Sequence, residues 1–508
     1  MCKPDNPSIR HVIISGAGPA GLLLAALLLQ RNNELPAPLY RITLVDNRQD
    51  LGQLSPEILK KKFRSWMLGL AGHGIAGLKQ VGPHEKLWKS YCRDVGIPLE
   101  SLSIHLGSKE LKTGNADPTS PDYVEGFIVD RNFIVATLAR YLSETSDGTL
   151  LTTLYNTKVL YVDHDNQRVL IRPTNPTNDE EERYMDYDLL VGCDGARSVV
   201  REALIKRHST FEMDVGDIFQ CFKAVHVQRP QNVDAGSMHL LPDCFPCMQG
   251  IALPETGDML NISIGIARHL FDTDKMAPEL KSDDPKVVSK YVQENFKAFD
   301  LMDYNDFAEQ WVAQRWNRTA QVHCSFYHST DINVVIMGDA AHATSPSIGM
   351  GMNQALKDAQ SLYLLLQQHK DDFSVVLPAF SEARVKEGNS LTDLAMNLYC
   401  MDTKTQLVET LHSVIRTTLH KWFPKLFLNH PQALIGRTDV GLADVYDLAT
   451  RLNIVPKHRR INDTIRQEYF EQQSGMVVTK KGQKGFLQKT ALLGALVAAG
   501  AVAYAKYL

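Results

Sequence analysis

The chain has 508 residues, of which 44% are hydrophobic and 22% charged, and its formal net charge is −4 at pH 7. These values are typical of globular proteins and exclude wholesale disorder, a collagen-like fibre and a polytopic membrane protein. The slightly acidic balance offers no basic surface for nucleic acid, and the eight scattered cysteines do not predict a disulfide framework.

The first predicted unit is a strand, a glycine turn, a helix and a second strand. The strand over residues 11–15 is followed by the turn GAGPAG, the apolar helix LLLAALLLQR and the strand RITLVD, which ends at Asp46. In this GxGxxG turn, Gly16 permits the tight turn, Gly18 lets the backbone approach a pyrophosphate, and Gly21 allows close helix packing. The helix N-terminus favours phosphates, and Asp46 is placed to bind ribose hydroxyls. The pattern predicts a dinucleotide site, with an ordinary glycine turn as the alternative.

Two later strand ends carry further candidate ligands. DYDLLVGCDGARSVVR contains a strand that ends in a turn at Asp194, with Arg201 shortly after it. INVVIMGDAAHATSPSIGMGMNQALKDAQSL contains a strand that ends at Asp339 and continues through a glycine-rich loop into a helix. An acidic residue at the carboxyl end of a strand, before a helix N-terminus, suits ribose and anionic groups. The alternatives are plain strand-to-helix turns, with Arg201 in a solvated salt bridge.

The order GxGxxG, DG and GD resembles the three fingerprints of class A flavoprotein monooxygenases. This resemblance implies that FAD is held by the GxGxxG and GD motifs, with NAD(P)H as co-substrate. It assigns these residues to FAD: Gly16, Gly18, Gly21, Asp46 and Asp339. It also implies that Asp194 and Arg201 serve both FAD and NAD(P)H.

The same resemblance implies two further contacts with the cofactor. The loop ATSPSIGMGMN lies against the isoalloxazine ring in this family, and it supplies backbone N–H groups there. The matching residues are Pro346, Gly349, Gly351, Met352 and Asn353. An arginine that opens a helix contacts the FAD phosphates, and Arg131 in VDRNFIVATLARYL takes that position.

Segments across nearly the whole chain resemble kynurenine 3-monooxygenases in the same order, among them FRSWMLGLAGHG, VGIPLESLSIH and LPAFSEARVKEGNSLTDLAM. This resemblance places Arg64 near the cofactor. It implies that NAD(P)H reduces FAD, that O2 forms a C4a-hydroperoxyflavin, and that this species hydroxylates an aromatic or similar electron-rich small molecule. The oxygen chemistry then belongs to the cofactor, so no catalytic residue of the chain is assigned.

The sequence departs from that family where the substrate is held. The family binds an amino-acid carboxylate with an arginine and a tyrosine after VGIP, but Leu102 stands in the arginine's place and the tyrosine has no match in register. Ser347 and Ile348 replace two aromatic residues, and Asn397 lies one place before the family's asparagine. A buried carboxylate without a paired cation costs several kcal/mol. We therefore expect a substrate less polar than L-kynurenine or differently anchored, with Lys223 as a possible substitute cation.

The sequence predicts an α/β fold in which a Rossmann-like FAD-binding domain is interleaved with a mixed or antiparallel β-sheet substrate domain. A helical C-terminal region and a C-terminal transmembrane helix follow. The predicted segments are an FAD-binding domain with inserted segments at 8–205, a β-sheet substrate domain at 206–330, the rest of the FAD-binding domain at 331–370, helices at 371–475 and a transmembrane tail at 486–508.

Several residues outside the three motifs allow two interpretations. His239 is either a pocket residue or, more in keeping with its apolar flanks, a satisfied core histidine. Cys244 and Cys247 have the spacing of a redox or zinc site but lack a second pair, so packing is favoured and no metal site is predicted. Met396 is expected first in the core and second in the pocket lining.

The chain ends in the apolar segment GFLQKTALLGALVAAGAVAYAKYL. With lysines at both ends, residues 486–508 are long enough for a tilted membrane span. Lys480, Lys481 and Lys484 give the span a basic flank, while a buried core helix is the alternative. The tail predicts a protein anchored at its C-terminus and facing the cytosol. The mitochondrial outer membrane is the favoured location and the endoplasmic reticulum the alternative.

Three functions are compatible with these features. The favoured hypothesis is an FAD-dependent monooxygenase that uses NAD(P)H and O2 to hydroxylate a small molecule. An epoxidase of an apolar substrate and a non-catalytic, membrane-tethered flavoprotein are the alternatives. The expected partners are the substrate, O2, NAD(P)H and a membrane, with no nucleic acid.

Overall fold

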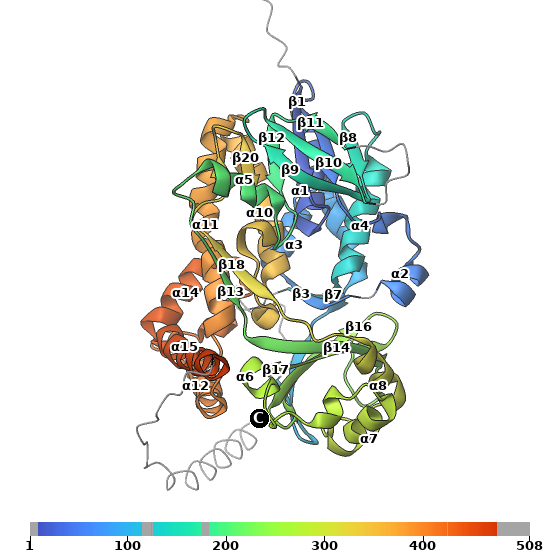
Figure 1. The fold of residues 1–508 in the computed structure, drawn as a ribbon, viewed down its shortest axis with the longest axis vertical. Coiled ribbons are helices and arrows are strands. Elements are labelled where there is room, and N and C mark those ends of the chain that lie inside the picture. Colours follow the sequence, from blue (N-terminus) through green and yellow to red (C-terminus); the bar gives the residue numbers. More distant parts are fainter. Residues whose placement is uncertain are drawn as a thin grey trace, which may run out of the picture.

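The computed structural model describes residues 9–474 except residues 64, 114–122, 124, 175–181 and 424. Its central sheet has the strand order β19-β20-β12-β1-β2-β8 (Figure 1). All neighbouring strands in it are parallel except the edge strand β19. The strands are β1 (Arg10–Ser15), β2 (Tyr40–Val45), β8 (Leu151–Leu154), β12 (Leu189–Gly192), β19 (His328–Ser329) and β20 (Val334–Ile336).

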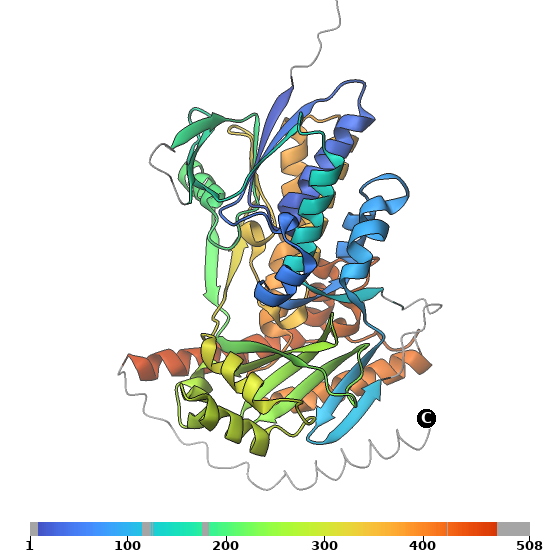
Figure 2. The same cartoon turned by 90° about the vertical axis from the view of Figure 1, so that its right-hand side faces the viewer.

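Both faces of the central sheet are covered, which explains why its strands are continuous apolar runs. Helices α1 (Pro19–Glu34), α4 (Arg131–Thr145) and α10 (Gly351–Gln368) cover one face. A three-stranded antiparallel sheet, β9 (Thr157–Asp163), β10 (Arg168–Pro173) and β11 (Arg183–Asp186), lies on the other side (Figure 2). Residues 20–28 of helix α1 are apolar on all sides and buried, so this part is a core helix rather than an amphipathic one, whereas the last turn is polar. This part of the fold confirms the Rossmann-like prediction.

A second six-stranded sheet lies below this domain, with the order β14-β17-β16-β15-β5-β6 (Figures 1 and 2). Its neighbours are antiparallel except β15 and β5, which are parallel. The sheet is therefore mixed, as predicted. Its strands are β5 (Ser101–Leu106), β6 (Lys109–Thr113), β14 (Gln220–Gln228), β15 (Ser237–Phe245), β16 (Met248–Glu255) and β17 (Met259–Ala267).

The two faces of the second sheet have different partners. Alternate side chains on its outer face pack against α7 (Pro285–Asn295) and α8 (Tyr304–Ala313) in a separate apolar core. The inner face is turned toward the sheet formed by β3 (Met67–Ala71), β7 (Gly126–Asp130) and β4 (Ile97–Pro98). The ribbon of β13 (Met213–Asp217) and β18 (Ala320–Cys324) joins the two domains.

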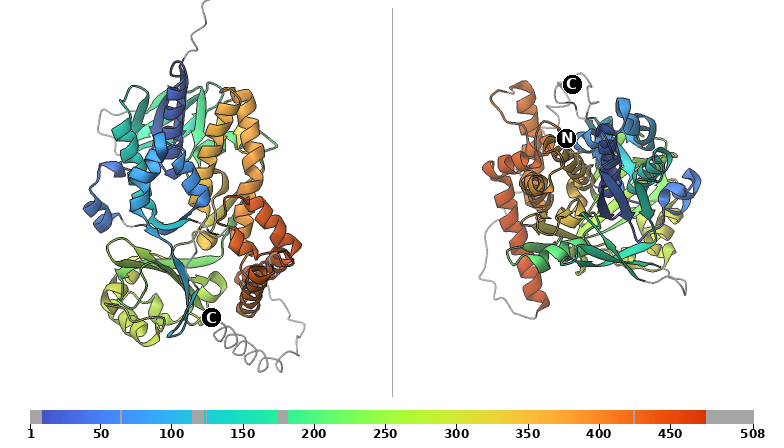
Figure 3. Two further views of the ribbon diagram at one scale, coloured as in Figure 1. Left: turned by 180° about the vertical axis from the view of Figure 1, so that it is seen from behind. Right: turned by 90° about the horizontal axis from the view of Figure 1, so that it is seen from above.

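The C-terminal region is helical, as predicted. It consists mainly of α11 (Phe373–Asn397), α12 (Thr403–Trp422), α14 (Leu442–Arg451) and α15 (Ile454–Gln473). Residues of α11, α14 and α15 form a third apolar core. Helices α12, α14 and α15 follow α11 in the chain and lie beside the second sheet (Figure 3). Two further helices that matter below are α5 (Val199–Arg207) and α9 (Asp339–His342).

The predicted fold class needs one correction, which concerns the transmembrane helix. Its predicted position, residues 486–508, lies outside the described residues. Within the described part of the chain, no helix combines the length and the apolar character that a membrane span requires. The long helix α15, for example, carries Arg459, Asp463 and Arg466 along its length. The structure therefore gives the transmembrane helix of the predicted fold class no support, and the membrane and mitochondrial assignments that rested on it are not shown.

A buried ionic network joins α10 to α11 and to the end of β20. The Asp358 carboxylate accepts hydrogen bonds from the Gly338 backbone N–H (2.8 Å), His342 Nε2 (2.6 Å) and Arg384 Nε (2.6 Å). Burial alone would raise the pKa of Asp358, but His342 and Arg384 lower it to about 2. The carboxylate therefore stays ionised and holds the turn at Gly338 in place.

We predict that Asp358→Asn destabilises the protein by about 3–5 kcal/mol, because it leaves the Arg384 guanidinium buried without its counter-charge. Urea unfolding of the purified protein measures this change. Asp372→Asn is the matched control, because asparagine caps a helix about as well as aspartate and this change at the exposed cap of α11 should cost less than about 1 kcal/mol. Equal stabilities of the two variants would contradict the assigned role of the network.

Candidate cofactor site

Three strand ends meet at one edge of the central sheet. Strands β1, β12 and β20 are parallel neighbours, so their carboxyl ends lie side by side. The chain continues this alignment beyond the strands, because Cys193 N donates to Ser15 O (2.7 Å) and Met337 N donates to Gly192 O (3.0 Å). The GxGxxG, DG and GD turns therefore begin next to one another, although they are far apart in the sequence.

The first two turns are in direct contact. Gly16 has a φ of +108°, and a Cβ atom added there would lie 2.2 Å from the backbone oxygen of Cys193. Only glycine therefore fits at this position. The close approach brings the GxGxxG and DG turns within van der Waals distance of each other.

Arg201 links the DG and GD turns. Its guanidinium is buried, with Nη1 donating to Ala340 O (2.7 Å) and Nη2 donating to Ala196 O (2.7 Å). The alternative of a solvated salt bridge is thus wrong, because both hydrogen bonds go to backbone carbonyl groups. The expected role of Arg201 toward FAD and NAD(P)H stays a prediction. Arg201 positions the two turns relative to each other.

Gly21 is tightly packed, whereas Gly18 borders open space. A Cβ atom added at Gly21 would lie 2.0 Å from Gly16 O, so α1 could not approach the turn with any other residue there. A Cβ atom added at Gly18 would have no atom of the described residues within 4 Å. The N-terminus of α1 has no side-chain cap, so its N–H groups point toward this open space. Its shape and polarity fit a pyrophosphate.

Asp46 lies at the end of β2 and holds the glycine turn. Its Oδ2 accepts from Ala17 N (2.7 Å), and its Oδ1 accepts from the backbone N (2.8 Å) and Nε (3.1 Å) of Arg48. Its Oδ2 also accepts from Nη2 of Arg48 (3.1 Å), so its roughly four lone-pair sites are all used within the chain. A ribose hydroxyl would have to replace one of the bonds from Arg48. The sequence analysis missed Arg48, whose only signal is its place two residues after the acidic strand end.

Arg131 and Asp339 lie in the same electrostatic environment. Both side chains are exposed to solvent, yet the surrounding protein removes water from both. This desolvation lowers the pKa of Arg131, and nearby Arg48 lowers it further, whereas Asp339 acts in the opposite direction. Desolvation likewise raises the pKa of Asp339 against the effect of His342 and Arg131. Two cations that repel each other in a concave, accessible place form a site for an anion.

The segment around residue 64 is attached to the start of α4. Asp130 accepts from Ser65 N (2.7 Å), and Asn132 Nδ2 donates to Phe63 O (2.8 Å). Both neighbours of Arg64 are thus fixed beside Arg131. Arg64 itself lies outside the described residues, so its place near the cofactor stays a prediction.

Asp194 caps α5 with one carboxylate oxygen, while the other oxygen accepts no hydrogen bond from the described residues. Its Oδ2 accepts from Val199 N (2.8 Å) and Val200 N (3.3 Å). Its Oδ1 is buried and has no hydrogen-bond partner among the described residues. Burial raises the pKa of this carboxyl group. A ligand that donates a hydrogen bond would satisfy Oδ1.

The glycine-rich loop after Asp339 leads into α10. Pro346 is exposed, Gly349 is half-buried with a φ of +66°, and Met352 is buried. A Cβ atom added at Gly349 would have no described atom within 4 Å, whereas one at Gly351 would lie 3.3 Å from Thr344. Pro346 and Gly349 therefore present the open surface of the loop.

Asn353 fixes this loop to the neighbouring sheet. Its Oδ1 accepts from Ala71 N (2.8 Å), and its Nδ2 donates to Gly69 O (2.8 Å) and Gly349 O (3.2 Å). The side chain is fully buried, and the hydrogen bonds of its amide all go to backbone groups. Asn353 shapes the loop that is predicted to lie against the ring, and its amide does not point freely into the site.

The inner face of the second sheet has an apolar, half-buried part at β5 and β15 and a polar part at β14, β16 and β17. The polar part carries the hydrogen-bonded residues His226, Glu255, Asn261 and Ser263. The apolar part is lined by Leu102, Ile104, Met238, Leu240 and, from the neighbouring strand β16, Ile251. Part of it packs against Met67 and Ile128 from the sheet above. Leu102, which stands in place of the family's arginine, pairs with Met238 in register and thus belongs to this face.

The candidate substitute cation, Lys223, is on the other face. Its Nζ donates to Trp311 O (2.6 Å) and lies 5.2 Å and 5.1 Å from the ring centroids of Trp311 and Trp316. Burial lowers the pKa of Lys223 to about 8. Lys223 cannot reach a substrate on the inner face, so that alternative is wrong.

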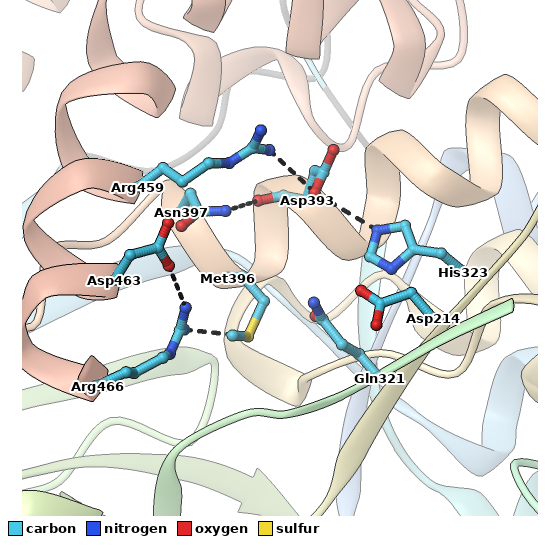
Figure 4. A pocket seen from close by; sticks show the side chains of 9 residues that line it. All are labelled: Asp214, Gln321, His323, Asp393, Met396, Asn397, Arg459, Asp463 and Arg466. Carbon is cyan, nitrogen blue, oxygen red and sulfur yellow. Dashed lines mark hydrogen bonds and ion pairs between the residues drawn. The ribbon is translucent and has the colours of Figure 1, made fainter. Parts of the chain in front are cut away.

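A polar cavity of about 360 Å³ lies between the β13–β18 ribbon, α11 and α15 (Figure 4). Met396 and Asn397 line it, so Met396 is not a core residue. The charges on its wall are mostly paired, with Arg459 3.1 Å from Asp393 and Arg466 2.9 Å from Asp463. None of the predicted cofactor residues lines this cavity.

Comparisons with known proteins agree with this geometry. A family model described as an FAD binding domain matches residues 131–372. Kynurenine 3-monooxygenase of Caenorhabditis elegans is 24% identical over 435 residues, which cover 82% of this chain and 87% of the relative. Violacein synthase of Chromobacterium violaceum is 25% identical over 442 residues, which cover 82% and 92%.

Solved structures share the fold. Pseudomonas aeruginosa PqsL in complex with 2-aminobenzoylacetate has a TM-score of 0.57 at 18% identity and covers 78% of this chain and 97% of its own. The tetrameric form of 2-methyl-3-hydroxypyridine-5-carboxylic acid oxygenase has a TM-score of 0.54 at 15% identity, with 84% and 96% covered. At these identities the likeness establishes the fold alone.

We predict that Gly18→Ala mainly weakens FAD binding, whereas Gly21→Ala mainly lowers the free energy of unfolding. Gly18 has ordinary extended backbone angles, so alanine should leave the unfolding free energy of the FAD-free protein within about 1 kcal/mol while weakening FAD binding at least about tenfold. Gly21→Ala should cost about 3 kcal/mol or more, because the methyl group overlaps Gly16 O. Flavin fluorescence titration and urea unfolding measure the two effects. Undiminished FAD affinity in Gly18→Ala would refute the pyrophosphate site.

Proposed function

Since this chain is a class A FAD-dependent monooxygenase that resembles kynurenine 3-monooxygenase, we propose that its substrate is an apolar, electron-rich aromatic molecule without a carboxylate anchor. The observation that carries this proposal is the apolar part of the inner face of the second sheet, with Leu102 in place of the family's arginine. The relatives favour the hydroxylase over the epoxidase and over the non-catalytic flavoprotein.

The cofactor chemistry follows from this family. FAD, when bound, accepts reducing equivalents from NAD(P)H and activates O2, which is chemistry that no side chain supplies. We propose that the N-terminus of α1 at Gly18 and the cations Arg48 and Arg131 hold the FAD phosphates. In the same proposal, Asp46 and Asp339 bind its hydroxyl groups, and the backbone of Pro346 and Gly349 faces its ring.

The contacts within the chain support this division of roles. The phosphates would separate and neutralise Arg48 and Arg131, whose charges otherwise oppose each other. A hydroxyl group would satisfy the carboxyl group of Asp339, which is open to solvent but poorly hydrated. Arg201 and Asn353 would position the site, because Arg201 donates to the backbone carbonyl groups of both turns and both N–H groups of the Asn353 amide donate to backbone oxygens.

The inner face determines which substrate would be retained. A charged carboxylate buried beside Leu102 would lose its hydration. Lys223 is on the opposite face, and His226 on the inner face is already hydrogen-bonded to Glu255. An apolar ring would instead gain about 25 cal/mol for each Å² of apolar surface that it buries. An apolar wall also excludes water from the reacting atoms.

We predict that uncharged aromatic compounds stimulate NAD(P)H oxidation with at least about tenfold higher kcat/KM than their amino-acid or carboxylate counterparts, which corresponds to about 1.4 kcal/mol. Paired compounds that differ only in this group, with the product identified by mass spectrometry, provide the measurement. A preference of the unmodified enzyme for the carboxylate member would refute the proposal.

The variant Leu102→Arg tests the same point from the protein side. It should raise kcat/KM for the carboxylate member of each pair and lower it for the uncharged member, because it restores a cation on the inner face. Leu106→Arg is the matched control, since Leu106 lies at the exposed end of the same strand. The same change in both variants would indicate a general charge effect and contradict the assigned place of Leu102.

A further inference from the structure

Two histidines and a glutamate gather on the outer side of the second sheet. His105 and Glu110 lie opposite each other in the β5–β6 hairpin, and His239 comes from the adjoining strand β15. Their nitrogen and carboxylate ligand atoms all lie within 4.8 Å of one another. Both histidines are buried and Glu110 is exposed. His239 therefore does not face the inner side of the sheet.

The hydrogen bonds of the two histidines determine where their protons are. His105 Nδ1 lies 3.2 Å from Ala298 O, and His239 Nε2 lies 3.0 Å from Asp234 O. A carbonyl oxygen can only accept a hydrogen bond, so each of these ring nitrogens must carry the proton. A neutral imidazole has one N–H group. The other nitrogen of each ring therefore has a lone pair.

These two lone pairs face each other. His105 Nε2 lies 3.0 Å from His239 Nδ1, with no proton left to share in the neutral forms. Such an arrangement is repulsive unless a positive charge lies between or beside the two atoms. Either an additional proton or a metal ion can supply that charge.

The surroundings favour a metal ion over a proton. Both rings are buried beside Phe299, and the carboxylate of Glu110 lies within 4.8 Å of their ligand nitrogens. Neutral imidazole nitrogens are ligands that Zn²⁺ prefers, and a carboxylate completes many zinc sites. A metal-bound histidine typically donates its second N–H to a backbone carbonyl, which is the arrangement of both rings here.

We propose that His105, His239 and Glu110 bind one Zn²⁺ ion, or a divalent transition-metal ion of similar preference. The ion would connect the edge hairpin β5–β6 to β15 and so stabilise the sheet whose inner face carries Leu102. The Phe299 ring packs against both imidazoles, with centroids 5.4 Å from His105 and 6.4 Å from His239, and closes the apolar side of the site. The role is structural, because the cluster lies on the face opposite Leu102.

The cysteine pair on the same strand does not complete this site. Cys244 is buried and its thiol contacts Met248 O, whereas Cys247 is exposed at the following turn. The proposed metal site is thus separate from Cys244 and Cys247, for which the sequence favoured packing and predicted no metal site. Cys247→Ser provides a control for adventitious binding of metal by an exposed thiol.

The test is a metal titration of the full-length protein after removal of metal with a chelator. We expect one Zn²⁺ per chain by elemental analysis and a higher melting temperature when Zn²⁺ is added, because an ion that binds only the folded state stabilises it. Mg²⁺ should have no such effect, since it prefers oxygen ligands. Co²⁺ should give the visible absorption of a site with nitrogen ligands.

Glu110→Gln is the main variant, because an exposed strand residue can be changed without disturbing the core. It should weaken Zn²⁺ binding at least tenfold, and His105→Gln and His239→Gln should abolish it. Cys247→Ser and His164→Gln, which alters a histidine of the remote β9–β10 turn, should bind Zn²⁺ like the unmodified protein. No stoichiometric Zn²⁺ in the unmodified protein, or equal affinity in Glu110→Gln, would overturn the proposal. Stability that depends on pH but not on Zn²⁺ would also overturn it and assign a shared proton instead.

Discussion

The parallel pairing of β1, β12 and β20 is the constraint on which the rest of this structure depends. Because parallel strands end at the same edge, three turns from distant parts of the chain meet there. Gly16 then contacts the backbone at Cys193, and Arg201 reaches Ala340 O. Each turn alone is an ordinary strand-to-helix connection. Together they bring the N-terminus of α1 and the carboxyl groups of Asp46, Asp194 and Asp339 to one edge of the sheet.

The second sheet divides two roles between its faces. The inner face is turned toward the sheet of β3, β7 and β4, and its apolar part around Leu102 would contact the proposed substrate. The outer face rests on α7 and α8 and carries the groups that stabilise the sheet, including Lys223 and the histidine pair of His105 and His239. Strand alternation separates the two sets, because successive side chains point to opposite faces.

The sequence allowed prediction of the features that local pattern determines. The β1–α1–β2 unit, with Gly16, Gly18 and Gly21, was predictable because the turn and its flanking apolar segments are contiguous. Asp194 and Asp339 were found as acidic strand ends. The bonds of Arg201 and Asn353 to backbone carbonyl groups were not predictable, because their acceptors are brought near only by the tertiary fold. The face occupied by Lys223 and the pairing of His105 with His239 depend on strand register, which one sequence does not reveal.

The central claim is that this chain is an oxygen-inserting flavoenzyme whose protein part selects an apolar aromatic substrate. The most direct test is turnover under ¹⁸O2 with FAD-loaded enzyme, NAD(P)H and an uncharged aromatic compound, followed by mass spectrometry of the product. The account predicts one ¹⁸O atom in the product for each NAD(P)H oxidised. Oxidation of NAD(P)H that yields only hydrogen peroxide, or product oxygen derived from water, would contradict it.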